Sequence, residues 1–109
     1  IMGDGSFFRD ALAQASFDAG AMRKIHCFRS ARLFVGLNCL APGQSQRRHT
    51  HEAADKFYLV LQGKARITVG AETREVVAGG LVWAPAGEPH GIETALEPTV
   101  LLVAMAPPP

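Results

Sequence analysis

The stretch "KFYLVLQGKARITV", residues 56–69, decides the fold. It holds two short runs, 56–61 and 64–69, that are separated only by Gln62 and Gly63. The second run alternates apolar with polar residues, which is the pattern of a strand with one buried face. Gly63 supplies the positive φ that a tight turn demands. The stretch therefore predicts two consecutive strands joined as a β-hairpin.

Further strands are predicted on both sides of this stretch. Residues 31–40, "ARLFVGLNCL", alternate as a strand with Leu33, Val35, Leu37 and Cys39 on one face, and the turn residues "APGQ" follow. Later runs with the same character are 73–77, 81–85, 90–94 and 99–105. Short strands at this spacing, with turn signals between them, predict an all-β sandwich or barrel.

One helix is predicted ahead of the strands. Residues 6–16, "SFFRDALAQAS", place a helix-capping residue, Ser6, before a stretch with helical periodicity. Its expected buried face consists of Phe8, Leu12 and Ala15.

The chain is expected to form a single domain, because it has 109 residues and a mass of 11.6 kDa. Residues 1–23 are assigned to an N-terminal extension, 24–106 to the barrel and 107–109 to a tail. A domain this small leaves apolar area near its surface, so a homodimer is expected.

Composition argues against several classes of partner. The net charge of +1 gives no sign of nucleic-acid binding, and no apolar run approaches the roughly 20 residues of a membrane helix. Cys27 and Cys39 are too few for a disulfide framework. We therefore expect a soluble, cytoplasmic protein with a small-molecule ligand and with neither nucleic acid nor membrane as a partner.

The candidate site begins in "RRHTHEAADKFY", residues 47–58. His49 and His51 are two apart, so on a strand they project to the same side and could hold one metal ion. A pair of this kind is a weak signal alone. His90 follows the turn-rich "PAGEP" and is weaker still.

The spacing of these residues resembles two motifs of the cupin superfamily. Gly43, five residues, His49-Thr50-His51, then Lys56, six residues and Gly63 resemble the first motif, with Lys56 at its glutamate position. The second motif is resembled by Gly79, five residues and Pro85-Ala-Gly-Glu-Pro-His90, with Thr94 where asparagine often stands. The resemblance covers residues 32 to 105, and it is to small single-domain cupins.

The resemblance implies a double-sheet jelly-roll barrel, commonly dimeric, with one divalent metal ion inside. His49, His51 and His90 match three of the four ligand positions. Iron, zinc, nickel, manganese and copper all suit such ligands, so the ligand type does not select the metal.

Lys56 is the main departure from the family pattern. Strand alternation from the family register turns Lys56, Tyr58 and Val60 inward and Asp55 outward, unless a bulge reverses Asp55. An inward lysine could pair with Asp55 or with a substrate carboxylate. It could instead act as a base or nucleophile of lowered pKa, or extend its stem to solvent.

Two functions remain open from the sequence. The first is a mononuclear-metal enzyme, of the dioxygenase, isomerase or decarboxylase kind, with Lys56 and Tyr58 as catalytic candidates and an anionic substrate if Lys56 stays charged. The alternative is a non-catalytic ligand-binding cupin with a degenerate or empty metal site. Gln44 and Gln46 are further candidates for ligand contacts, and Trp83 is expected in the core or the pocket wall.

Overall fold

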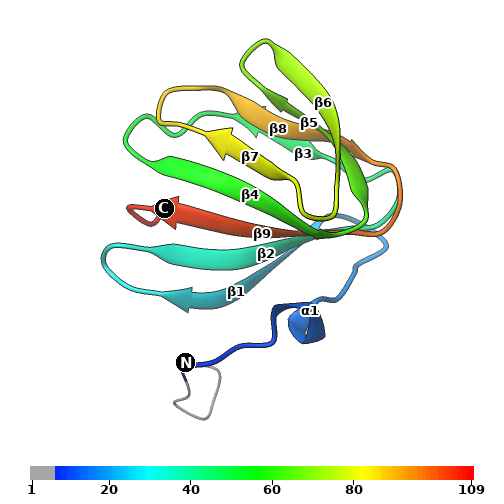
Figure 1. The fold of residues 1–109 in the computed structure, drawn as a ribbon, viewed down its shortest axis with the longest axis horizontal. Helices are drawn as coiled ribbons and strands as arrows, with labels where there is room; N and C mark the ends of the chain where they lie inside the picture. Colours follow the sequence, from blue (N-terminus) through cyan, green and yellow to red (C-terminus); the bar gives the residue numbers. More distant parts are fainter. Residues whose placement is uncertain (1–6) are drawn as a thin grey trace.

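The computed structural model describes residues 7–109 as two antiparallel sheets and one short helix (Figure 1). The five-stranded sheet has the order β1-β2-β9-β4-β7, and the four-stranded sheet has the order β3-β8-β5-β6. The elements are α1 (Ala11–Gln14), β1 (Arg23–Arg29), β2 (Phe34–Leu40), β3 (Gln46–His49), β4 (Asp55–Gln62), β5 (Lys64–Val69), β6 (Glu72–Val77), β7 (Leu81–Ala84), β8 (His90–Ala95) and β9 (Thr99–Ala106).

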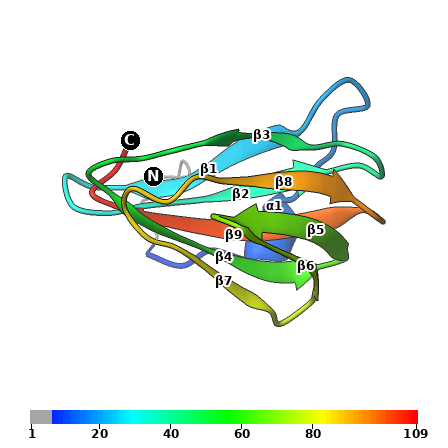
Figure 2. The same cartoon turned by 90° about the horizontal axis from the view of Figure 1, so that it is seen from above.

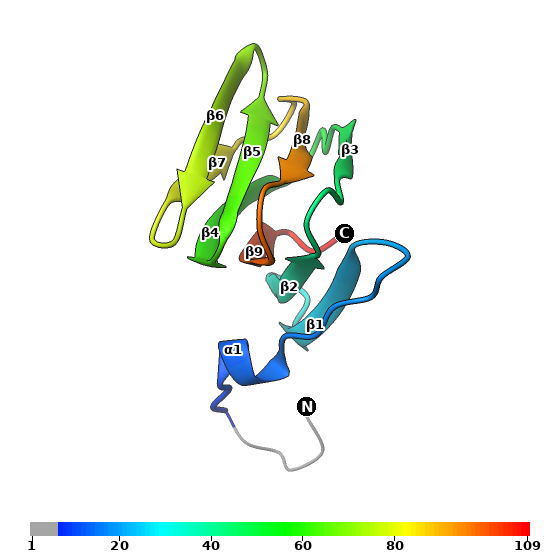
Figure 3. The same cartoon turned by 90° about the vertical axis from the view of Figure 1, so that its right-hand side faces the viewer.

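The two sheets face each other and enclose the main core (Figures 2 and 3). Side chains from both sheets meet there, namely Leu40, Tyr58, Val60, Ala65, Ile67, Ile92, Ala95, Leu101 and Val103. This arrangement confirms the predicted double-sheet barrel. Within residues 7–109, no helix is both long enough and apolar enough to span a membrane.

The predicted hairpin at Gly63 is wrong. β4 pairs with β7 and β9 in one sheet, whereas β5 pairs with β6 and β8 in the other, so the chain crosses between sheets at Gly63. Gly63 does have the expected positive φ of 92°. A Cβ on this residue would lie 2.2 Å from the carbonyl oxygen of Pro98, so the corner is packed against the chain that enters β9. Glycine is required here for a corner that looks like a hairpin in the sequence.

The predicted helix over residues 6–16 is also wrong in extent, and Ser6 lies outside the described residues. The helix spans only Ala11–Gln14, and its N-cap is Asp10, whose Oδ1 accepts a hydrogen bond from the backbone N–H of Ala13 at 3.2 Å. Phe8 is 86% exposed, so no burial favours an earlier turn. Ala11 and Ala15 pack on the sheet instead.

A second apolar cluster explains the position of this N-terminal segment. It lies on the outer face of the five-stranded sheet, which the helix approaches from outside (Figure 3). Val35, Leu37 and Cys39 belong to it, so the predicted common face of this strand is confirmed, although β2 begins only at Phe34 and Leu33 precedes it. Since these residues face outward, the alternate residues of β2 face the other sheet.

Trp83 does not lie in the core or in the wall of the histidine pocket. It is 59% exposed on β7, opposite Phe57 of β4 and on the outer side of the sheet. Leu81 on the same strand is 71% exposed. These residues extend the outer apolar face beyond the part that the N-terminal segment covers.

Candidate metal centre

Three histidines meet at one end of the space between the sheets. His49 is the last residue of β3, His51 follows in the loop after it, and His90 opens β8 opposite His49. Each offers one ring nitrogen, and these three atoms lie within 4.8 Å of one another. The centroid of the His49 ring lies 4.8 Å from that of His51 and 4.4 Å from that of His90. The predicted grouping of the three residues is therefore present, although His51 is not on a strand.

Backbone carbonyls fix the rings of two of these histidines. Nδ1 of His49 lies 3.0 Å from the carbonyl oxygen of Arg47, and Nδ1 of His90 lies 2.9 Å from that of Glu88. A carbonyl only accepts hydrogen bonds, so each Nδ1 carries the proton and donates it. The Nε2 atom of each neutral ring is then left with its lone pair available, which is the form that binds metal.

Burial keeps the imidazoles neutral. It is the largest cause that lowers the pKa of His49 and of His51, and the positive charge of Lys56 lowers both further. Burial is the main cause that lowers the pKa of His90 to about 4, and the positive charge of Lys56 lowers it as well. The hydrogen bond to the carbonyl of Glu88 acts in the opposite direction and raises it. At neutral pH all three rings are therefore neutral imidazoles, as ligation requires.

The residues fit a metal ion in one further respect. Nε2 of His90 is buried and has no hydrogen-bond partner among the described residues. A buried acceptor without a partner is unfavourable, and such atoms commonly mark a missing ion or water. The atom belongs to the same cluster as the rings of His49 and His51, so one ion could satisfy it.

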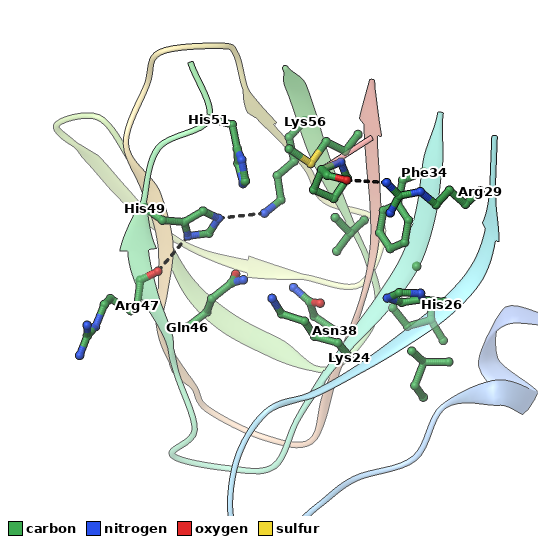
Figure 4. A pocket seen from close by; sticks show the side chains of 16 residues that line it. Lys24, His26, Arg29, Phe34, Asn38, Gln46, Arg47, His49, His51 and Lys56 are labelled. Atoms are coloured by element: carbon green, nitrogen blue, oxygen red, sulfur yellow. Dashed lines mark hydrogen bonds between the residues drawn. The ribbon is translucent and has the colours of Figure 1, made fainter. Parts of the chain in front are cut away.

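Lys56 occupies the inner face of β4, as strand alternation predicts. It is 5% exposed, and its Nζ lies 3.3 Å from Nε2 of His49 (Figure 4). A metal ion on this nitrogen and the hydrogen bond from Lys56 exclude each other, because both use the same lone pair. The lysine side chain would therefore have to move for His49 to hold an ion.

Asp55 does not neutralise Lys56. No bulge turns its side chain inward, and its Oδ1 accepts a hydrogen bond from the backbone N–H of Ala86 at 3.0 Å. Burial, and then the positive charge of Lys24, lower the pKa of Lys56 to about 8. Lys56 is thus still mainly charged at neutral pH.

A cavity of about 420 Å³ opens beside the histidines (Figure 4). Gln46 lines it, and the hydroxyl of Tyr58 donates to Oε1 of this glutamine at 3.0 Å. Tyr58 is fully buried, and burial raises the pKa of its phenol. Gln44 does not line the cavity. Its Oε1 accepts a hydrogen bond from the N–H of Ala41 at 2.8 Å, and its Nε2 donates to the carbonyl oxygen of Asp18 at 2.7 Å.

Two residues that line the cavity were not predicted from the sequence. Asn38 is 5% exposed on the inner face of β2, and Lys24 faces it across the β1–β2 pair. The alternation of residues 31–40 contains a hint of Asn38, because this polar residue lies on the face of the strand opposite Leu37 and Cys39. The sequence does not show that this face points into the barrel, because the apolar face of β2 turns out to be the outer one.

Comparison with known proteins decides the family. Residues 36–105, more than half of the chain, match the family described as Cupin domain. The chain belongs to the cupin family. This cupin is also 39% identical over 80 residues to the uncharacterized protein SCO3923 of Streptomyces coelicolor, a match that covers 73% of this chain and 75% of that protein.

Solved structures agree with the fold. The crystal structure of TT1209 from Thermus thermophilus is 39% identical and superposes with a TM-score of 0.89 over 94% of this cupin and 98% of that chain. KdgF from Halomonas sp. is 24% identical, with a TM-score of 0.83 over 96% of each chain, and shows a likeness of fold.

Proposed function

We propose that this cupin binds one divalent metal ion through His49, His51 and His90 and acts as a mononuclear-metal enzyme on a small polar substrate. The observation that carries the proposal is the buried Nε2 of His90, which lacks a partner among the described residues and lies in a cluster with two other neutral imidazoles. Iron, zinc, nickel, manganese or copper would suit this set of nitrogen ligands.

A bound metal ion would supply Lewis acidity or an oxygen-binding position, since three protein ligands leave coordination positions open. The remaining chemistry belongs to the chain. The carbonyls of Arg47 and Glu88 hold two of the rings in the ligating tautomer. Tyr58 fixes the amide of Gln46 at the cavity wall, so we assign it a positioning role. Lys56 keeps a positive charge beside the histidines.

The candidate reactions are oxygen-dependent oxidation, isomerisation and decarboxylation. All three fit a single metal ion with open positions next to a cavity of this size. Oxygen consumption across a panel of small polar substrates separates the first reaction from the other two. Product analysis under nitrogen separates isomerisation from release of carbon dioxide.

One observation favours the alternative, a ligand-binding cupin without metal or turnover. Lys56 stands where the family motif has glutamate, and its ammonium group bonds the nitrogen of His49 that would hold the ion. In that case Lys56 would take the place of the metal ion as the cation beside the histidines.

Elemental analysis of protein purified without chelator tests the metal centre. We expect close to one equivalent of metal in the wild type and a loss of at least tenfold in metal affinity in His51→Ala. His26→Ala is the matched control, because His26 lines the same cavity outside the triad and packs edge-on against Phe34. A wild type without metal, or a His51→Ala variant that binds as tightly, would refute the three-histidine centre.

We also propose that two copies associate through the outer face of the five-stranded sheet. Phe57, Leu81 and Trp83 are 37%, 71% and 59% exposed there. They continue an apolar surface that the chain itself already covers with Ala11 and Ala15. The proposed location is the cytoplasm, and the two free, buried cysteines fit a reducing compartment.

A further inference from the structure

The charged side chains that line the cavity beside the histidines are all basic. Its charged lining residues are Lys24, Arg29, Arg47 and Lys56, and none of the described residues that line it is aspartate or glutamate. Buried charges in proteins are normally paired or hydrogen-bonded, because removal from water is costly. Lys24, Arg29 and Arg47 are exposed, and Arg29 donates a hydrogen bond to the carbonyl oxygen of Pro109. Lys56 is the one buried cation among these four, so its missing acidic partner is the feature that needs an explanation.

Lys56 is the most deeply buried of these cations. It is only 5% exposed, and its one hydrogen-bond partner within residues 7–109 is the imidazole of His49. The described ion pairs join Lys64, Arg66 and Arg74 to glutamates on β6, which lies in the other sheet. Asp55, its neighbour in sequence, is turned away to Ala86. Lys56 thus has no carboxylate among the described residues.

Hydrogen-bond donors surround the same space. Asn38 is as buried as Lys56, and its amide makes no side-chain hydrogen bond to any residue from 7 to 109. Gln46 accepts from Tyr58 through Oε1, which leaves its NH₂ group as a free donor. Figure 4 shows Lys56 on one side of the cavity, Lys24 and Asn38 on the other, and Gln46 between them and His49.

We propose that this cavity binds a carboxylate-bearing small molecule, with its acid group between Lys24 and Lys56 and within reach of the amides of Asn38 and Gln46. A carboxylate has two oxygens with about four acceptor positions, which matches two ammonium groups and two amide donors. The anion would also relieve the repulsion between the two lysines.

Only the statement that the bound acid is the substrate rests on the proposed function. The binding itself needs no metal ion, because the four recognition groups lie outside the histidine triad. A hydroxyl or keto group next to the acid would then extend toward the histidines, at the open coordination positions.

The test compares acids with neutral molecules of the same size on chelator-treated protein. Acetate, succinate and gluconate are titrated by calorimetry against acetamide, succinamide and glucitol, and the side-chain amide signals of Asn38 and Gln46 are followed by NMR. We expect at least one acid to bind more than tenfold more tightly than its neutral counterpart and to shift both amide signals.

Variants locate the binding. Lys24→Met and Lys56→Met should each weaken binding of the acid by about tenfold. Lys64→Met removes the same charge from an exposed lysine that pairs with Glu75 at 3.4 Å, so it should leave the affinity unchanged. Lys24 is exposed on an edge strand, so Lys24→Met tests the site without changing a buried residue.

Three outcomes would overturn the inference: no acid binds, acids and neutral molecules bind alike, or Lys64→Met weakens binding as much as the cavity variants do. Failure of this test is distinct from failure of the metal centre. If the protein binds metal but no acid, only the proposed carboxylate site is refuted. If it binds acid but never takes up metal, only the proposed three-histidine centre is refuted.

Discussion

The two faces of the five-stranded sheet each depart, in one region, from an ordinary half-exposed sheet. Its inner face carries Lys24, Asn38 and Lys56 around a cavity, whereas its outer face carries Phe57 and Trp83 toward the surface. An antiparallel sheet with one solvated face normally places apolar residues inside and polar residues outside. The rest of the inner face is apolar and forms the core, so the departure on that side is confined to the cavity. It matches the proposed ligand site, and the exposed apolar residues of the outer face match the proposed contact between two copies.

The largest effect is expected from removal of the inner charge. Lys56→Met should stabilise the metal-free protein by up to about 3 kcal/mol at pH 7, since the shift from the ordinary pKa of 10.5 to about 8 measures the cost of burying the ammonium. Chemical denaturation of wild type and variant measures the difference. An equal or less stable variant would show that Lys56 is satisfied in the folded protein.

The same charge predicts a pH dependence. Between about pH 8 and pH 10 the unfolded chain keeps its proton on Lys56 while the folded protein loses it, so stability rises with pH in this window. The histidines act at lower pH. Their pKa values are lowered on folding, so stability falls as pH falls from about 6.5 toward the pKa of His90 near 4. Lys56→Met should abolish the rise at high pH and keep the fall at low pH.

The next effect concerns metal affinity. Lys56→Glu should tighten metal binding by about tenfold to a hundredfold, because it frees Nε2 of His49 and adds the carboxylate of the family motif. Competition with a chelating dye measures this affinity. Lys56→Met serves as the control that frees the nitrogen without adding a ligand, and it should give a smaller gain. Unchanged affinity in both variants would mean that Lys56 does not compete with the ion.

Substitutions on the outer face of the five-stranded sheet should have the smallest effect on the stability of one protomer and should act mainly on self-association. The double variant Leu81→Ser and Trp83→Ser should weaken self-association at least tenfold, while the fold of each protomer stays intact because both side chains are already exposed. Light scattering across a concentration series measures the assembly. A matched double substitution on β6 in the other sheet, Thr73→Ser and Glu75→Gln, should leave it unchanged. A wild type that stays monomeric at all concentrations would contradict the proposed dimer.

Local pattern was enough to predict most strands and the inward position of Lys56. Alternation is a property of a strand by itself, so the burial of Lys56, Tyr58 and Val60 followed from the register of the motif. The grouping of His49, His51 and His90 came from the resemblance to the two cupin motifs, and the three side chains do lie together. Strand alternation needs only neighbours in sequence, whereas the register and the grouping of the histidines needed the family motifs.

The errors arose where the outcome depends on distant segments. A glycine with positive φ serves a hairpin and a corner equally well, and only the pairing of β4 with β9 decides for the corner at Gly63. The expectation that Trp83 lies in the core or the pocket wall is wrong because the face of β7 that carries it points outward, and it is 59% exposed. Asn38 was missed for the same reason, since the apolar row of β2 is covered by the N-terminal segment instead of the opposite sheet.

The position of β1 has a consequence for how ligand preference can change. This strand is the edge of its sheet and pairs only with β2 among the described strands, yet it brings Lys24 to the cavity. Edge strands open locally at a lower free energy than the strands between them. The cation can therefore be repositioned, or exchanged for another side chain, while the two sheets that hold the histidines remain closed. The strand that sets ligand preference is thus separate from the strands and loop that hold the histidines.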